Sequence, residues 1–451
     1  MYKIILPIRY LLKRRITYFA VVAVALCVFI VVVVMTVLIG LVTDYKQKNH
    51  NFVGDCVIGT ESLVGFPYYE DFIEKLHRED FVKGISPVIK SYALVSPVGT
   101  ERNIAVEVMG IDPVSHSQVT HFAKTLHYHE NDVSKVFESV NDSNCLGCVL
   151  GIDLALERDE QGRYIYGFRP EDANIALAIT FFPLTAKGAL AKAGTNLVNT
   201  QVLYYSDTSQ SGLARTDSSI IYLPFEPAQL LCGMAGPVKR ANAIHIKFKP
   251  NVKMQVGCEK TASLWQKFKR EKANQEQADL LDTVTVQNWK DYRRAFIAAM
   301  EKEQTMMTAM FGLVGITTVF IVFVVFYMII SHKSKDIGIL KSIGVSNTNI
   351  IQLFLGFAFS VGLLGSAIGL VAGWQFLVHI NEIEDWLFEH FGFQLWDRSI
   401  YAIGDIPNHI EVKVLVVITL SALAACLVGA LVPSWHAARL KPVETLQVSQ
   451  L

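Results

Sequence analysis

The chain has 451 residues, of which 51% are hydrophobic and 18% are charged, and its mean hydropathy is +0.34. This share of charged residues excludes a protein that lies wholly within a lipid bilayer, so part of the chain faces water. The formal net charge is +0, which gives no overall electrostatic attraction to nucleic acid.

Four apolar runs are long enough to cross about 30 Å of hydrocarbon at about 1.5 Å per residue. Each must be helical, because lipid offers no hydrogen-bond partner to backbone N–H and C=O groups. The first run carries no charge from Ile16 to Thr43 and no small-residue cleavage site follows it, so we expect it to be retained rather than removed as a signal peptide. The predicted spans are 17–43, 305–331, 350–380 and 414–432.

Basic residues beside these spans predict their orientation. They cluster before the first span, between the second and third, and after the fourth, and the positive-inside rule places these segments in the cytoplasm. The residues are Lys3, Arg9, Lys13, Arg14, Arg15, Lys333, Lys335, Lys341, Arg439 and Lys441. The sequence therefore predicts a cytoplasmic N-terminal segment 1–16, a cytoplasmic loop 332–349 and a cytoplasmic tail 433–451, with segment 44–304 and the acidic connector 381–413 outside.

The outer segment 44–304 is long enough for a large domain with its own core, and its patterns are of mixed α+β type. We expect helices at 71–78, 227–231 and 261–281, the last charged on most faces and therefore solvated. We expect strands at 92–95, 104–109, 201–205, 219–223 and 243–248, with a polar loop at 206–218. The predicted fold class is thus four transmembrane helices with a large α+β domain inserted between the first two.

Two clusters in the outer segment invite a chemical interpretation. Cys145 and Cys148 have the spacing of a redox motif or half a zinc site, but a local disulfide or two idle thiols is the interpretation we favour. His116, His121, His127 and His129 are interpreted as surface histidines rather than metal ligands, because no two combine ligand spacing with a fixed acidic partner. We assign no metal ligand and no catalytic residue.

The loop between the second and third spans predicts a short helix. Ser334 can cap its start, Asp336 lies in its first turn and Gly344 can end it. The helix is too short to span a membrane, yet it carries Ile337, Ile339, Leu340 and Ile343. Such a helix either lies on lipid headgroups or docks in a groove of another subunit.

The third span carries glycines at a repeated spacing. Gly362, Gly365 and Gly369 fall on one helical face, and Gly365-x-x-x-Gly369 is a spacing that lets helix backbones approach closely. The simpler alternative is that glycine is common in membrane helices. No charged residue interrupts the core of any span, so nothing in the spans indicates an ion or proton path.

Two distant motifs carry a resemblance to a known family. The coupling-helix region of the FtsX/MacB-type ABC permeases resembles the stretch Asp336-Ile-Gly-Ile-Leu-Lys-Ser-Ile-Gly344. The family's closing motif resembles Pro433-Ser-Trp-His-Ala-Ala-Arg-Leu-Lys-Pro-Val-Glu-Thr-Leu446, and its key positions here are Pro433, Arg439, Pro442 and Glu444. Segments 6–15, 84–88, 110–113, 150–155 and 289–307 are similar to the lipoprotein-releasing LolC/LolE-type members. Region 160–218, where that group has its chaperone-contacting hook, departs from the pattern.

The resemblance implies a non-enzymatic permease of a bacterial inner membrane. It implies a dimer with a second permease, identical or different, on a dimer of cytoplasmic ABC ATPases that bind ATP and Mg. This chain itself would bind no cofactor, and it contains no Gly-x-x-x-x-Gly-Lys-Ser/Thr loop. The residues implied to contact the ATPase are Asp336, Ile337, Gly338, Ile339, Leu340, Lys341, Ile343 and Gly344.

In such a machine ATP-driven motion pushes on the coupling helix, shifts the second and third spans and is transmitted to the outer domain. The implied cargo is a membrane lipoprotein, handed in the presence of membrane lipids to a periplasmic carrier chaperone. Alternatives are a permease of FtsX or MacB type that couples ATP hydrolysis to a cell-wall hydrolase or to efflux of peptide or macrolide-like substrates. A membrane sensor is a further alternative, but the short cytoplasmic segments leave no room for an output domain, and an enzyme built on Cys145 and Cys148 is the least favoured.

Overall fold

The computed structural model describes residues 15–100, 102–139, 145–166, 175–191, 198–332, 334–394, 396, 405–408 and 411–439. Pro442 and Glu444 of the closing motif, and residues 1–14, lie outside this part. The chain divides into two compact units: a helical unit of residues 1–43, 299–395 and 405–451, and a sheet unit of residues 44–298 and 396–404.

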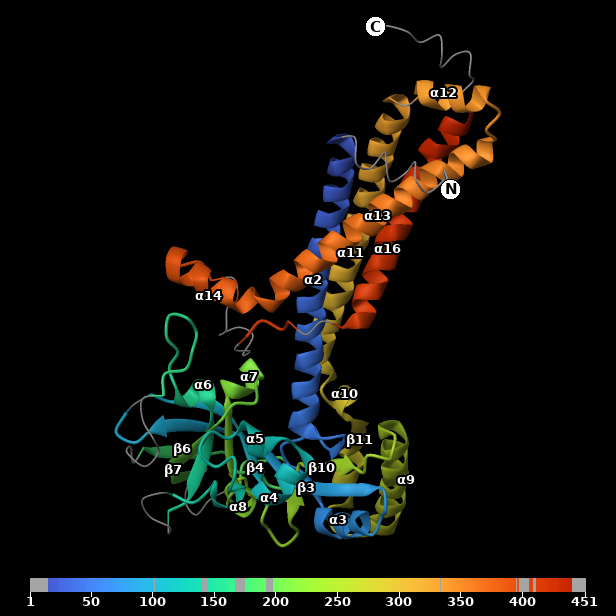
Figure 1. Ribbon diagram of the computed structural model, residues 1–451. Helices are drawn as coiled ribbons and strands as arrows, with labels where there is room; N and C mark the ends of the chain where they lie inside the picture. Colours follow the sequence, from blue (N-terminus) through green and yellow to red (C-terminus); the bar gives the residue numbers. More distant parts are fainter. Residues whose placement is uncertain are drawn as a thin grey trace. The chain divides into compact units, whose positions relative to one another are not determined.

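Four helices are long and apolar enough to cross a membrane among the described residues: α2 (Arg15–Val53), α11 (Arg294–His332), α13 (Asn347–Val378) and α16 (Val412–Arg439) (Figure 1). Two shorter helices, α12 (Ser334–Ser342) and α14 (Ile380–Phe391), follow α11 and α13. The predicted fold class, four apolar helices with a large α+β domain after the first, is confirmed.

The helices extend further than the apolar runs predicted. α11 begins at Arg294 rather than 305, because residues 294–304 contain no glycine or proline and consist mostly of good helix formers. α2 continues to Val53 and ends before Gly54, whose φ of 82° is a left-handed conformation. The connector predicted at 381–413 contains α14. These differences arise because hydropathy locates lipid-facing segments, whereas a helix ends only where the backbone requires it.

The closing motif also begins inside a helix. The tail expected from residue 433 is helical as far as Arg439, with Pro433 inside α16. Proline removes one backbone donor, but the helix continues through Ser434, whose hydroxyl donates to the Ala430 carbonyl at 2.6 Å.

The sheet unit is built on a mixed sheet, of which the described residues form nine strands in the order β11-β1-β10-β3-β4-β8-β5-β7-β6. β6 also pairs with β3, so the six strands from β3 to β6 close into a ring, and β10, β1 and β11 extend it on one side. The strands are β1 (Cys56–Gly59), β3 (Val82–Pro97), β4 (Ile104–Ile111), β5 (Gly147–Gly151), β6 (Ala176–Phe181), β7 (Asn199–Ser209), β8 (Ile220–Pro224), β10 (Ala243–Phe248) and β11 (Thr285–Asn288), with β2 (Phe66–Pro67) and β9 (Arg240–Ala241) forming a separate pair.

Short helices surround this sheet. They are α3 (Tyr69–His77), α4 (Pro113–Val119), α5 (Phe122–Thr125), η1 (Val133–Lys135), α6 (Ile152–Ala155), α7 (Ala214–Asp217), α8 (Phe225–Leu231), α9 (Met254–Lys272), η2 (Ala278–Thr283) and α10 (Trp289–Tyr292). The predicted polar loop 206–218 is wrong in part. β7 runs on to Ser209 and α7 follows; the buried carboxylate of Asp207 is satisfied there by the backbone N–H groups of His127, Tyr128 and His129.

The helix predicted at 261–281 differs from α9 in both its bounds and its role. α9 buries Trp265 and Phe268, each 1% exposed, against Phe72, with ring centroids 4.9 and 5.0 Å apart. The apolar positions are few among many charges, so the sequence indicated a solvated helix. The large area of the two aromatic rings is nevertheless enough to fix one face in the core.

Candidate functional site: helix α12 and its surroundings

Helix α12 is ended by its glycine. Gly344 has a φ of 95°, which a residue with a Cβ atom rarely adopts, and its N–H donates to the Lys341 carbonyl at 3.0 Å. The N–H of Val345 donates to the Leu340 carbonyl at 3.1 Å. Two residues later Ser346 caps α13. The chain therefore turns sharply from α12 into α13, and Asp336 and Gly338 lie within α12.

One face of α12 is anchored in the helical unit. Ile337 is 2% exposed and belongs to a cluster made by side chains of three long helices. The other members are Ile330 of α11, Ile350, Leu353 and Phe354 of α13, and Ala437 and Ala438 of α16. A displacement of α12 therefore acts on three long helices at once.

The opposite face of α12 is apolar and exposed. Ile339 is 51% exposed, and Ile343, in the turn directly after α12, is 76% exposed. The Ile343 N–H donates to the Ile339 carbonyl at 3.2 Å, so the helical pattern continues to Ile343. Residues four apart lie on the same side of a helix, so these two side chains form one apolar patch, with Leu340 half-buried beside it. Ile339 and Ile343 are hereafter called the α12 patch.

A hydrogen bond joins the two motifs that lie far apart in the sequence. Lys341 Nζ donates to the carbonyl of Ala438 at 2.6 Å, near the C-terminal end of α16, where the last carbonyls of a helix have no partner within the helix. The adjacent Arg439 guanidinium stacks 3.7 Å from the ring of Trp435. Both Lys341 and Arg439 thus have structural roles that sequence reasoning did not assign.

The three glycines of α13 face two different helices. A Cβ atom on Gly362 would lie 3.1 Å from Leu423 Cδ2 of α16, whereas one on Gly365 would lie 2.8 Å from Val24 Cβ of α2. One on Gly369 would lie 2.5 Å from the carbonyl oxygen of Ala25, also in α2. Sequence reasoning missed Gly429 of α16, whose Cβ would lie 2.7 Å from the Val319 carbonyl oxygen of α11. These glycines allow α13 to approach α2 and α16, and α16 to approach α11.

Within the sheet unit, the end of α2 is tied to the residues that lead into α11. Arg293 is buried, and its Nε donates to Asn49 Oδ1 at 2.8 Å. The rings of His50 and Trp289 stack with centroids 4.9 Å apart, and the backbone N–H of Trp289 donates to the Asp55 carbonyl at 3.2 Å. We call this group the root. No local pattern predicts the root, because Asn49 and Arg293 are 244 positions apart.

Asp55 connects the root to the sheet. Its carboxylate accepts hydrogen bonds from His50, from Lys247 and from the backbone N–H of Phe248, at 2.7, 2.9 and 2.8 Å. Burial alone would raise the pKa of Asp55, but these hydrogen bonds outweigh it and lower the pKa to about 2.

We expect the ionised Asp55 carboxylate to stabilise the folded chain above pH 4, the range of an unfolded aspartate. This contribution is lost as the pH falls from about 4 through about 2, where the native carboxyl takes up its proton. Thermal unfolding of the full chain in detergent should show Asp55→Asn less stable than the wild type at pH 7, with the gap closing towards pH 2. A gap that stays constant with pH would contradict this role.

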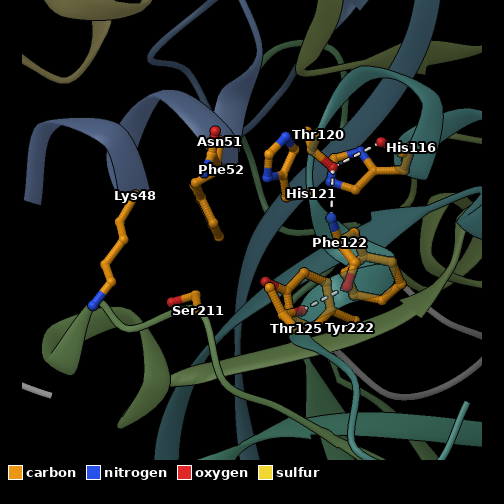
Figure 2. A pocket seen from close by; sticks show the side chains of 10 residues that line it. All are labelled: Lys48, Asn51, Phe52, His116, Thr120, His121, Phe122, Thr125, Ser211 and Tyr222. Atoms are coloured by element: carbon orange, nitrogen blue, oxygen red, sulfur yellow. Dashed lines mark hydrogen bonds between the residues drawn. The ribbon is translucent and has the colours of Figure 1, made fainter. Parts of the chain in front are cut away.

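The cavity in Figure 2 is structural rather than a ligand site. It measures about 30 Å³ and is lined by His116, His121, Tyr222 and residues of α2, enough for about one water molecule. His116 is 2% exposed, so its interpretation as a surface residue was wrong. Its Nδ1 lies 3.1 Å from Ser86 Oγ, and burial lowers its pKa to about 3, which keeps the ring neutral.

The other clusters also have structural explanations. His129 Nδ1 lies 3.0 Å from the buried carboxylate of Asp207, so this histidine does have a fixed acidic partner, contrary to the expectation. Among the described residues no group of three His, Cys, Asp or Glu side chains could hold a metal ion. Cys148 is buried in β5, and burial raises the pKa of its thiol to about 12, which makes it a poor nucleophile.

Comparison with known proteins places α12, the anchoring cluster and most of the closing motif in a single family domain. Residues 308–442 match the family model described as "FtsX-like permease C-terminal". The lipoprotein-releasing system transmembrane protein LolC of Xylella fastidiosa (strain Temecula1) is 25% identical over 162 residues, which cover 36% of this chain and 39% of that protein. LolC of Neisseria meningitidis serogroup B is 24% identical over 166 residues, which cover 37% of this chain and 40% of that protein.

A solved structure also matches part of the chain. The periplasmic region of MacB from Actinobacillus actinomycetemcomitans covers 56% of this chain and 97% of its own, with 11% identity and a TM-score of 0.30. The match with the first curated relative spans 39% of that protein's length. Residues 308–442 are thus similar to the C-terminal domain of FtsX-like permeases, and the described residues include four helices long and apolar enough to cross a membrane.

Proposed function

We propose that this chain is the non-catalytic, membrane-spanning subunit of an ABC transporter and that the α12 patch docks on a separate cytoplasmic ATPase. The observation that carries the proposal is the pairing of two exposed apolar side chains, Ile339 of α12 and Ile343 in the turn after it, with a buried anchor on the same helix, Ile337. A helix that only rested on headgroups would not need hydrogen bonding and packing to three long helices. ATP and Mg would be bound by the partner, and α12 would receive the motion.

The contacts of α12 suggest how that motion travels. Ile337 packs with side chains of α11, α13 and α16, and Lys341 donates a hydrogen bond to a carbonyl near the end of α16. A force on the α12 patch therefore reaches all three helices. Gly365 and Gly369 bring α13 against α2. α2 and α11 are the helices whose chain continues into the sheet unit, where the root joins their ends. A displacement of α12 is thereby transmitted to the sheet unit. This mechanism needs no substrate channel through the membrane.

We further propose that the cargo is a membrane lipoprotein. The support is that several relatives are named lipoprotein-releasing system proteins, including LolE of Haemophilus influenzae, 25% identical over 119 residues. We propose a bacterial inner membrane as the location, with both termini and α12 in the cytoplasm and the sheet unit outside; the support for this orientation is the set of basic residues beside the helices. A second permease and a periplasmic carrier chaperone complete the proposed assembly.

Reconstitution tests both levels of the proposal. The chain is purified with its co-purifying ATPase and second permease, placed in proteoliposomes loaded with a triacylated lipoprotein, and given ATP. We expect ATP-dependent release of the lipoprotein to an added carrier. Copurification and ATP hydrolysis without release would contradict the cargo, whereas failure of any ATPase to bind the chain would contradict the permease role itself.

A further inference from the structure

Two cysteines of the sheet unit meet in its core. Cys56 is the first residue of β1 and is 0% exposed, and Cys258 lies in the second turn of α9, half-buried against the same apolar cluster. Cys56 is itself a member of the apolar cluster that α9 covers with Trp265 and Phe268, so its side chain lies on the same side of the sheet as Cys258. Cys258 Sγ also lies 4.0 Å from the carbonyl oxygen of Asp55, the residue before Cys56. The two side chains therefore face each other across the packing of α9 on β1.

We propose that Cys56 and Cys258 form a reversible disulfide by exchange with an external disulfide, such as oxidised glutathione or a disulfide oxidoreductase. In the first step the Cys258 thiolate attacks one sulfur of the external disulfide and expels one thiolate. In the second step Cys56 loses its proton, attacks the Cys258 sulfur and expels the second thiolate. The two cysteines lose two electrons and two protons in total, and the external disulfide is reduced to two thiols.

Exposure fixes the order of these steps. Cys258 is half-buried and reachable from solvent, whereas Cys56 is buried. Hydrogen bonding with the neighbouring Cys56 thiol lowers the pKa of Cys258. The same hydrogen bond, together with burial, raises the pKa of Cys56, so Cys56 stays a thiol until Cys258 has reacted. Cys258 is therefore the attacking residue and Cys56 the resolving one.

The bond would cross-link the strand that directly follows α2 to helix α9. Asp55, which binds the root through its carbonyl and β10 through its carboxylate, precedes Cys56 in the chain. Oxidation would thus fasten α9 to the segment through which α2 enters the sheet. Cys148 and Cys232, whose pKa values burial raises to about 12 and about 11, compete poorly for the same oxidant.

Redox titration of the full chain in detergent micelles tests the pair. The chain is equilibrated in buffers of oxidised and reduced glutathione, quenched with acid, denatured, alkylated with N-ethylmaleimide and analysed by mass spectrometry. We expect Cys56 and Cys258 to lose alkylation together, with one midpoint, while Cys232→Ser leaves that midpoint unchanged. Independent midpoints, or two thiols that remain alkylated in fully oxidised buffer, would overturn the proposal.

Single variants test the order of attack. Cys56→Ser removes the resolving residue, so a glutathione adduct should accumulate on Cys258. Cys258→Ser removes the attacking residue, so Cys56 should remain fully alkylated after denaturation in the same buffers. An adduct on Cys56 in Cys258→Ser would contradict the assigned order. None of these readouts depends on ATP or on transport, so failure of the pair is distinct from failure of the proposed permease function.

Discussion

We expect that replacing Ile343 by Asp abolishes the proposed ATP-driven transport while the chain still folds and inserts. The side chain is 76% exposed, so the substitution disturbs little packing within the chain. In the docked state it places a carboxylate in an apolar groove, at a cost of about 3 kcal/mol or more, which weakens docking at least about 100-fold. The measurement is ATP-dependent cargo release by the reconstituted complex, together with the amount of ATPase that co-purifies.

Thr348→Asp is the matched control for this variant. Thr348 is exposed in the first turn of α13. Its replacement by Asp adds the same charge a few residues away from the α12 patch. We expect this control to retain transport and the ATPase, and Ile339→Asp to behave like Ile343→Asp. Normal coupling in both isoleucine variants would rule out docking through the α12 patch.

Gly369→Ala should destabilise the helical unit although it adds a single methyl group. Its Cβ would lie 2.5 Å from the carbonyl oxygen of Ala25, and a backbone atom cannot move aside as a flexible side chain can. α13 and α2 must therefore separate, at a cost of about 1–3 kcal/mol, to be measured as a lower midpoint of thermal unfolding in micelles.

The control for Gly369→Ala lies on the same helix. A Cβ on Gly356 would meet nothing within 4 Å, so Gly356→Ala should leave the midpoint unchanged or raise it, because alanine favours helix more than glycine does. Equal stability of the two variants would contradict close packing of α13 on α2.

Some of this architecture could be read directly from the residues. Continuous apolar runs located the four long helices because lipid and core both select apolar side chains, and Gly344 located the end of α12 because a left-handed φ favours glycine. The strand 243–248 matched β10, where alternation is not masked by neighbouring polar groups. In each case the signal is local.

The parts that escaped prediction depend on contacts between distant residues. Lys341 and Ala438 are 97 positions apart, and nothing in either motif indicates that a lysine will donate to a carbonyl of α16. Burial of His116 depends on the helix α4 packing against β3 and β10, and the core face of α9 depends on the position of Phe72. Such pairings are determined by the tertiary fold and leave no pattern in a single stretch of sequence.

The most direct test of the account is a photo-crosslink from the α12 patch. A benzophenone amino acid is placed at Ile343 in the chain, with Thr348 as the control position, and cells are irradiated before the membranes are solubilised. We predict that position 343 crosslinks to a cytoplasmic ATPase and that position 348 does so far less. Crosslinking of position 343 to phospholipid alone would show that α12 rests on the membrane surface, and would contradict the docking role.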